Sequence, residues 1–153
     1  MLALCLVPIA LQGLAILVDE AWFHHRRGLP RWEQIGHPLD TLTVAAGFAW
    51  LCLTRPDQSF ALPVYIALGA FSCLFVTKDT PLHARVCNAG EMWLHAVLFV
   101  LHPLVFVASG FIWWFGLAPG LLAGQLVVML VYASYQFFYW RWWWHRRQSN
   151  PSP

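Results

Sequence analysis

Charged residues are scarce in this chain. They make up 10% of its 153 residues, whereas a soluble domain carries about 25%. Hydrophobic residues make up 59%, and the mean hydropathy is +0.58. This composition predicts an integral membrane protein, and the length suits one domain. The net charge of +2 is small and no RNA- or DNA-binding signature accompanies it, so we do not expect nucleic acid as a partner.

Several familiar site patterns are also absent. The four cysteines form neither a CxxC motif nor a disulfide framework. No HExxH zinc-protease motif occurs, and neither do the HxxxH and HxxHH histidine boxes of membrane desaturases and hydroxylases. The N-terminus lacks a basic region and a cleavage site, so we expect residues 2–18 to be a retained membrane span.

Apolar runs and helix-breaking residues predict an all-α fold with five transmembrane helices in a single domain, residues 1–147. The first helix is expected to continue to Arg27 and to stop at Gly28, and Asn88 is expected to cap the fourth. Trp140–Arg147 has the composition of an interfacial anchor, and residues 148–153 are expected to be disordered. The expected membrane spans cover residues 2–18, 42–53, 60–76, 92–115 and 121–139.

The order of these segments predicts two parallel helical hairpins, residues 1–54 and 59–115, that form a four-helix bundle. Residues 121–147 are expected to add a fifth helix at the C-terminus. Most positive charges follow the first, third and fifth spans. The positive-inside rule therefore places those segments and the C-terminus in the cytoplasm and the N-terminus outside, as in a bacterial inner membrane.

At four places a carboxylate is followed by a histidine four residues later. Seven carboxylates and seven histidines placed at random would give 7 × 7 / 153, or about 0.3, such pairs. On a helix, residues at this spacing lie on one face, about 5–6 Å apart at Cβ, so each pair can offer an oxygen and an imidazole to one ion. The pairs are Glu20 with His24, Glu33 with His37, Asp79 with His83, and Glu91 with His95.

The predicted fold brings these eight side chains to the cytoplasmic end of the bundle. Four carboxylates match the charge of two divalent cations, which favours a dinuclear site. Dinuclear sites of Glu and His occur in soluble helical bundles, although with a Glu-x-x-His spacing, which is one residue shorter. The mixed oxygen and nitrogen donors suit iron or zinc, with manganese possible.

Four further residues belong to the same polar segments. Asp19 precedes Glu20 and could replace it as a ligand. Asp40 is placed to orient a metal-bound histidine from outside the ligand set. Cys87 could be a ligand or a redox partner, although a partly buried free thiol is the favoured interpretation. His102 could be a deep ligand, a substrate contact or a hydrogen-bonded core histidine, and the sequence leaves these alternatives open.

Each pair also has a structural interpretation. Glu91 could complete a capping box with Asn88, and Glu20 could pair with Arg26 or Arg27. We favour metal binding because chance does not account for four pairs at one offset.

The predicted function is that of a membrane metalloenzyme whose substrate is a lipid or another apolar molecule. Iron would support oxidation, and zinc would support hydrolysis. One alternative is a non-catalytic protein whose metals cross-link the helices, in which case no substrate-sized pocket should adjoin the site. Another is a metal sensor or transporter, although a transporter should place its ligands near the membrane midplane.

Overall fold

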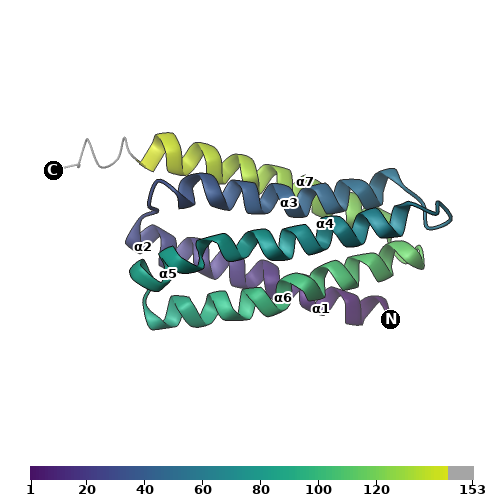
Figure 1. The fold of residues 1–153 in the computed structure, drawn as a ribbon, viewed down its shortest axis with the longest axis horizontal. Helices are drawn as coiled ribbons and strands as arrows, with labels where there is room; N and C mark the ends of the chain where they lie inside the picture. Colours follow the sequence, from purple (N-terminus) through teal and green to yellow (C-terminus); the bar gives the residue numbers. More distant parts are fainter. Residues whose placement is uncertain (145–153) are drawn as a thin grey trace.

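The computed structural model describes residues 1–144, which fold entirely into helices and short connections, with no strand in that range (Figure 1). This confirms the all-α prediction. The predicted disordered tail, residues 148–153, and residues 145–147 of the predicted anchor lie outside the described range. The helices are α1 (Leu2–Val18), α2 (His25–Arg27), α3 (Glu33–Leu53), α4 (Ala61–Phe75), α5 (Thr80–Val86), α6 (Ala89–Trp114) and α7 (Pro119–Phe138), with a 3₁₀ turn η2 (Val76–Asp79) and two π-helical turns, η1 (Asp19–His24) and η3 (Tyr139–Trp143).

Four continuous helical stretches are long and apolar enough to cross a membrane. They are Leu2–Arg27, Ala61–Val86, Ala89–Trp114 and Pro119–Trp142. The remaining long helix, α3, has 21 residues but is more polar, because it carries Glu33, His37 and Asp40 in its first half. It is also rich in buried residues. A polar helix of this kind needs other helices around it to cover those groups.

The local stop and start signals behave as the sequence predicted. Gly28 ends the first helical stretch with a positive φ of 75°, a conformation that suits a residue without Cβ. The side chain of Asn88 caps α6 by accepting hydrogen bonds from the backbone N–H groups of Gly90 and Glu91, at 2.9 and 3.0 Å. Both turns lie at one end of the bundle, opposite the N-terminus (Figure 1).

The order of packing differs from the predicted pair of hairpins with an added helix. α3 makes its largest interface with α7 and a smaller one with α4, whereas α1 packs mainly against α6. The prediction that the fifth helix merely adds to a four-helix bundle is therefore wrong. Small residues and interhelical hydrogen bonds decide such contacts in membranes, and the Thr41 hydroxyl on α3 donates to Gln136 on α7 at 2.9 Å.

The apolar core fills the half of the bundle near the N-terminus. Phe48 and Ile112 are wholly buried there. The Tyr65 hydroxyl donates to the carbonyl of Phe106 at 2.7 Å. A Cβ on Gly47 would lie 2.7 Å from the Phe106 ring, so only glycine permits this approach of α3 to α6. This packed half leaves the opposite end of the bundle to polar side chains.

Candidate metal centre

Nearly all the carboxylates of the chain gather at the end of the bundle that holds Gly28. The exception is Asp57, which pairs with Arg55 on the exposed turn at the other end. Carboxylates and histidines are both deeply buried at the first end, which is costly unless they are paired with each other or with a cation. The buried members are Asp19, Glu20, His24, Glu33, Asp79, His83, Glu91, His95 and His102.

Three overlapping groups of side chains offer donor atoms that lie within 4.8 Å of one another. Opposite ligands of one ion, with bonds of about 2.0–2.3 Å, lie up to about 4.6 Å apart, so groups of this size fit an ion after small adjustments. Because His83 and His95 each belong to two groups, the three join into one unit, which we call the histidine–carboxylate cluster. The groups are Asp19, His24, Glu91 and His95; Glu33, His37 and His83; and His83, Cys87 and His95.

The cluster has two halves that adjoin through pairs of imidazole rings, which lie close together with tilted planes. The rings of His83 and His95 have centroids 4.2 Å apart, and those of His24 and His37 are 4.8 Å apart. The first group offers two carboxylates and two imidazoles, and the second offers one carboxylate and two imidazoles. Donors of this kind suit iron, zinc and manganese.

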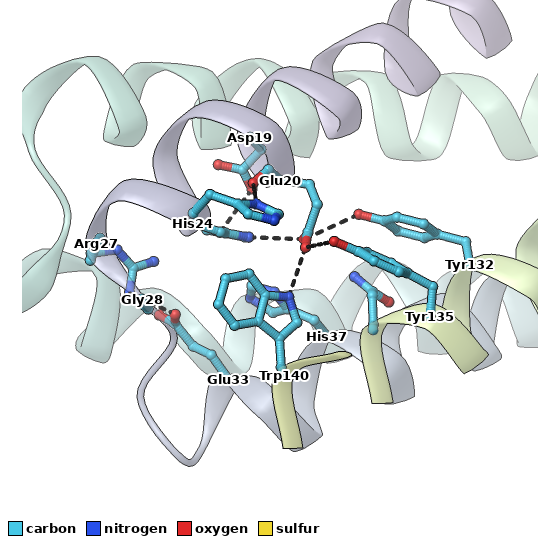
Figure 2. Close-up of polar contacts among 12 residues, drawn as sticks. Asp19, Glu20, His24, Arg27, Gly28, Glu33, His37, Tyr132, Tyr135 and Trp140 are labelled. Carbon is cyan, nitrogen blue, oxygen red and sulfur yellow. Dashed lines mark hydrogen bonds and ion pairs between the residues drawn. The ribbon is translucent and has the colours of Figure 1, made fainter. Parts of the chain in front are cut away.

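The π-helical turn η1 carries three buried polar side chains of the first helical stretch. Its hydrogen bonds close at i→i+5, so the turn is wider than in an α-helix, and π-turns occur often at functional sites. Asp19, Glu20 and His24 are all buried on this one turn (Figure 2). Asp19 and Glu20 point to different partners, His95 on α6 and Trp140 near the C-terminal end of the described chain.

Contacts within the cluster run both between helices and along the first helical stretch. Asp19 Oδ2 lies 3.2 Å from Nε2 of His95 and 3.2 Å from Nε2 of His24. Glu33 Oε1 lies 3.2 Å from Nε2 of His83. Of the four predicted pairs, only Glu20 and His24 make contact with each other, at 3.3 Å.

Several donor atoms of the cluster are buried and lack a hydrogen-bond partner. Buried polar atoms without partners are rare in native structures and point to a missing ion or water. Of the seven such atoms in the described part of the chain, five belong to the cluster. These five are Oδ1 of Asp19, Nε2 of His24, Oε1 of Glu33, Nε2 of His83 and Nδ1 of His95. Three of them, Nε2 of His24, Oε1 of Glu33 and Nε2 of His83, take part in the 3.2 Å ion-pair contacts above but without hydrogen-bond geometry.

Arg27 bridges the two buried glutamates of the cluster, and the sequence interpretation missed this role. Its guanidinium donates to Glu33 Oε2 at 2.8 Å and to Glu91 Oε1 at 2.8 and 3.1 Å (Figure 2 shows Arg27 beside Glu33). Glu91 therefore turns to Arg27, and no capping-box bond of its carboxylate to Asn88 is present among its described contacts. The sequence did contain a signal for this role, the pattern His-His-Arg-Arg just before Gly28. The pattern places a cation at the end of the helical turn that faces inward.

Glu20 belongs to none of the three donor groups. Its carboxylate accepts hydrogen bonds from Trp140 Nε1 at 2.7 Å, from the Tyr135 hydroxyl at 3.1 Å and from the Tyr132 hydroxyl at 3.4 Å (Figure 2). Trp140 is wholly buried, so it differs from the interfacial role predicted for the Trp140–Arg147 segment. Asp19, rather than Glu20, is therefore the carboxylate of this segment that belongs to the cluster, which is the alternative considered in the sequence analysis.

Asp79 also lies outside the donor groups. It accepts from Trp32 Nε1 at 2.6 Å and from Lys78 Nζ at 2.8 Å. The same Lys78 ammonium contacts both oxygens of Asp40 at 2.7 Å. Asp40 is therefore anchored to Lys78, and no hydrogen bond from it to His37 is described.

The two remaining candidates have different surroundings. Cys87 can join His83 and His95 in a donor group. Burial, followed by the charge of Glu91, raises the pKa of its thiol to about 12, so it is a neutral thiol unless a metal ion displaces its proton. His102 bonds Ser72 at 3.0 Å and lies outside the cluster.

Two cations pair with carboxylates at this end of the bundle. Six carboxylates lie here, and Arg27 and Lys78 form ion pairs with four of them. The other two, Asp19 and Glu20, contact histidines instead. The six carboxylates are Asp19, Glu20, Glu33, Asp40, Asp79 and Glu91.

A cavity of about 350 Å³ adjoins the cluster and extends from it into the apolar part of the bundle. Small-molecule sites usually have volumes of about 300–1,000 Å³. His24, His37 and His95 form part of its wall at the cluster, and aliphatic side chains of α1, α6 and α7 contribute much of its apolar surface. The arrangement thus combines metal donors with a mainly apolar pocket.

Comparisons of the chain with protein-family models, with curated proteins and with solved structures find no match. The residues therefore establish a helical protein with four helices suited to a membrane and with His, Asp and Glu groups that could hold a metal ion.

Proposed function

We propose that this protein is an integral-membrane metalloenzyme with two metal ions in the histidine–carboxylate cluster. The observation that carries the proposal is the set of five buried cluster atoms without hydrogen-bond partners. They come from two adjoining donor groups that together provide four imidazoles and three carboxylates. Two divalent ions would coordinate these atoms and would also compensate the charge of Asp19, whose described ion pairs are with histidines.

The donor set favours iron, and oxidation is our first choice of reaction. One group, Glu33 with His37 and His83, has the two histidines and one carboxylate that are typical of non-haem iron sites with open positions. Bound iron would supply oxygen activation, whereas bound zinc would supply hydrolysis. The protein itself would position the ions through Arg27, which fixes both glutamates, and would exclude water through burial of the site.

The cavity beside the cluster favours an enzyme over a protein whose metals only cross-link helices. A structural site has a closed ligand shell and needs no adjoining space, whereas here the pocket wall includes His24, His37, His83 and His95. The mainly apolar lining suits a lipid or another apolar substrate. Metal transport is disfavoured because the cluster lies at one end of the bundle rather than near its middle.

We further propose the orientation and number of the spans. The cluster end carries Arg26, Arg27, Lys78 and Arg85, so the positive-inside rule places it in the cytoplasm and the N-terminus outside. Helix α3 would be the fifth span, because 21 residues reach about 31 Å at 1.5 Å per residue, close to the hydrocarbon thickness of about 30 Å.

The metal content of the purified chain tests the proposal directly. Protein prepared without added metal and without a histidine tag should contain about two ions per chain by mass spectrometry, and their identity would select oxidative or hydrolytic assays. Glu33→Ala and Glu91→Ala should each lower the bound metal, because each removes a donor from a different group. Asp57→Ala, at the opposite end, is the matched control. Stoichiometric metal in both glutamate variants would refute the shared centre.

A further inference from the structure

The cavity continues well beyond the metal centre, along the first helix. Gln12 and Gly13 of α1 contribute to its wall. Gln12 lies seven residues before Asp19, which corresponds to about 10 Å along a helix. The cavity therefore extends along α1 beyond the proposed metal ligands.

This part of the cavity opens sideways between α1 and α7. These helices flank it but make no extensive interface with each other, since α1 packs against α6 and α7 against α3. Leu17 on α1 and Val128 on α7 both line the cavity, yet they are 61% and 60% exposed. A Cβ on Gly13 would meet no atom within 4 Å. Near the cluster, the hydrogen bonds of Glu20 to Tyr132, Tyr135 and Trp140 hold the two helices together (Figure 2).

A chain of hydrogen bonds fixes the direction in which Gln12 points its amide. The Thr43 hydroxyl donates to the carbonyl of Asp40 at 2.7 Å, because a carbonyl can only accept. Ser72 must then donate its proton to Thr43 across 2.7 Å, and Nε2 of His102 must donate to Ser72 across 3.0 Å. A hydroxyl has one proton to give, so the order has no alternative.

In the neutral His102 ring the proton is on Nε2, so Nδ1 can only accept a hydrogen bond. The amide nitrogen of Gln12 donates to that Nδ1 at 3.4 Å. The amide oxygen of Gln12 is therefore left over, and it is buried without a hydrogen-bond partner. Gln12 lines the cavity, so a small rotation of its side chain would present this oxygen to a bound molecule as an acceptor.

We infer that the cavity binds a single-chain amphiphile that enters from the bilayer between α1 and α7 and donates a hydrogen bond from a hydroxyl group to Gln12. The volume of about 350 Å³ lies near the lower limit for ligand sites, which favours one hydrocarbon chain over a two-chain lipid. This inference rests on the proposed function only in taking the amphiphile as the substrate of the metal centre.

Photolabelling of the full chain in phosphatidylcholine vesicles tests the inference. The probes are hexadecanol with a diazirine in its chain and the methyl ether of the same molecule, which lacks the hydroxyl proton. Peptide mapping should find the label on α1 and α7 beside the opening, and excess hexadecanol should prevent it. The alcohol should label about two- to tenfold more strongly than the ether, as expected for one hydrogen bond.

Two pairs of variants separate the entrance from the hydroxyl contact. Gly13→Phe should reduce labelling several-fold, whereas Gly124→Phe should not, because Gly124 also has open space around it but does not line the cavity. Gln12→Leu should make the two probes equivalent, whereas Gln125→Leu should preserve the preference for the alcohol.

Metal content measured on the same samples distinguishes the two proposals. Labelling of this pattern without bound metal would support the amphiphile site and refute the metal centre. Stoichiometric metal with no competable labelling of the cavity would overturn the amphiphile site and leave the metal centre intact. Equal effects of Gly13→Phe and Gly124→Phe would overturn the entrance between α1 and α7, and equal labelling by both probes in the unaltered protein would overturn the hydroxyl contact.

Discussion

Two histidines on α6 allow a sharp test of where the metal binds. His95 and His102 lie two turns apart on the same helix, and both are 7% exposed. His95 belongs to two donor groups, and its Nε2 is 3.2 Å from Asp19. His102 belongs to none and contacts Ser72 and Gln12 instead. Replacing each by alanine removes the same buried ring, but only one replacement removes a metal donor.

The expected loss for His95→Ala follows from the donor count. Residues that only orient a ligand already cost about 10–100-fold in metal affinity when they are replaced. Loss of a ligand should cost at least about 100-fold, which is about 3 kcal/mol. Because His95 belongs to only one of the two groups that would hold the proposed ions, the ion bound with Asp19, His24 and Glu91 should be weakened most. His102→Ala should retain its metal and lose about 1–3 kcal/mol of stability, since it leaves Ser72 and Gln12 without their partner.

The assay is metal retained per chain after equilibration with a series of competing chelators, read by mass spectrometry. Thermal unfolding in detergent runs in parallel, to separate metal loss from unfolding. Added imidazole should partly restore the metal in His95→Ala by occupying the vacated space. Full metal retention by His95→Ala would refute the assignment of this residue. Equal loss in folded His102→Ala would refute the location of the centre.

Two further predictions concern the supports of the cluster. Trp140→Phe removes the 2.7 Å hydrogen bond to Glu20 and should cost about 1.5–3 kcal/mol, the range for a bond to a charged group. Its apparent Tm should fall well below that of the exposed control Trp142→Phe, and equal values would contradict the proposed role of the bond. Arg27→Met leaves two wholly buried carboxylates without their cation and should lower the stability by about 3 kcal/mol. This is the lower end of the range for a broken buried pair, and we choose it because the arginine side chain is 17% exposed. Thermal unfolding should show a much smaller loss for Arg26→Met, whose side chain lies on a tryptophan ring; matching losses would argue against the bridge.

The sequence determined the broad class of the fold and the end of the bundle that holds the polar groups. A chain with so few polar residues cannot shield such long apolar runs from water. In a membrane the same runs can fold as helices, because a helix satisfies its own backbone hydrogen-bonding groups. Local signals were equally readable: Gly28 stops a helix because it tolerates positive φ, and Asn88 caps one because its side chain reaches the free N–H groups. The spacing of four residues correctly indicated that carboxylates and histidines face inward together.

Only the tertiary structure decided which of these side chains meet. A spacing along one helix does not encode which neighbour that helix packs against, so the contact of His83 with Glu33 and the bridge from Arg27 could not be predicted from either segment alone. Asp19 contacts His95 on α6, and the aromatic donors of α7 and η3 hold Glu20 outside the donor groups. These outcomes depend on packing between helices that are distant in sequence, because small differences in side-chain fit and hydrogen bonding decide the order of helices in a bundle.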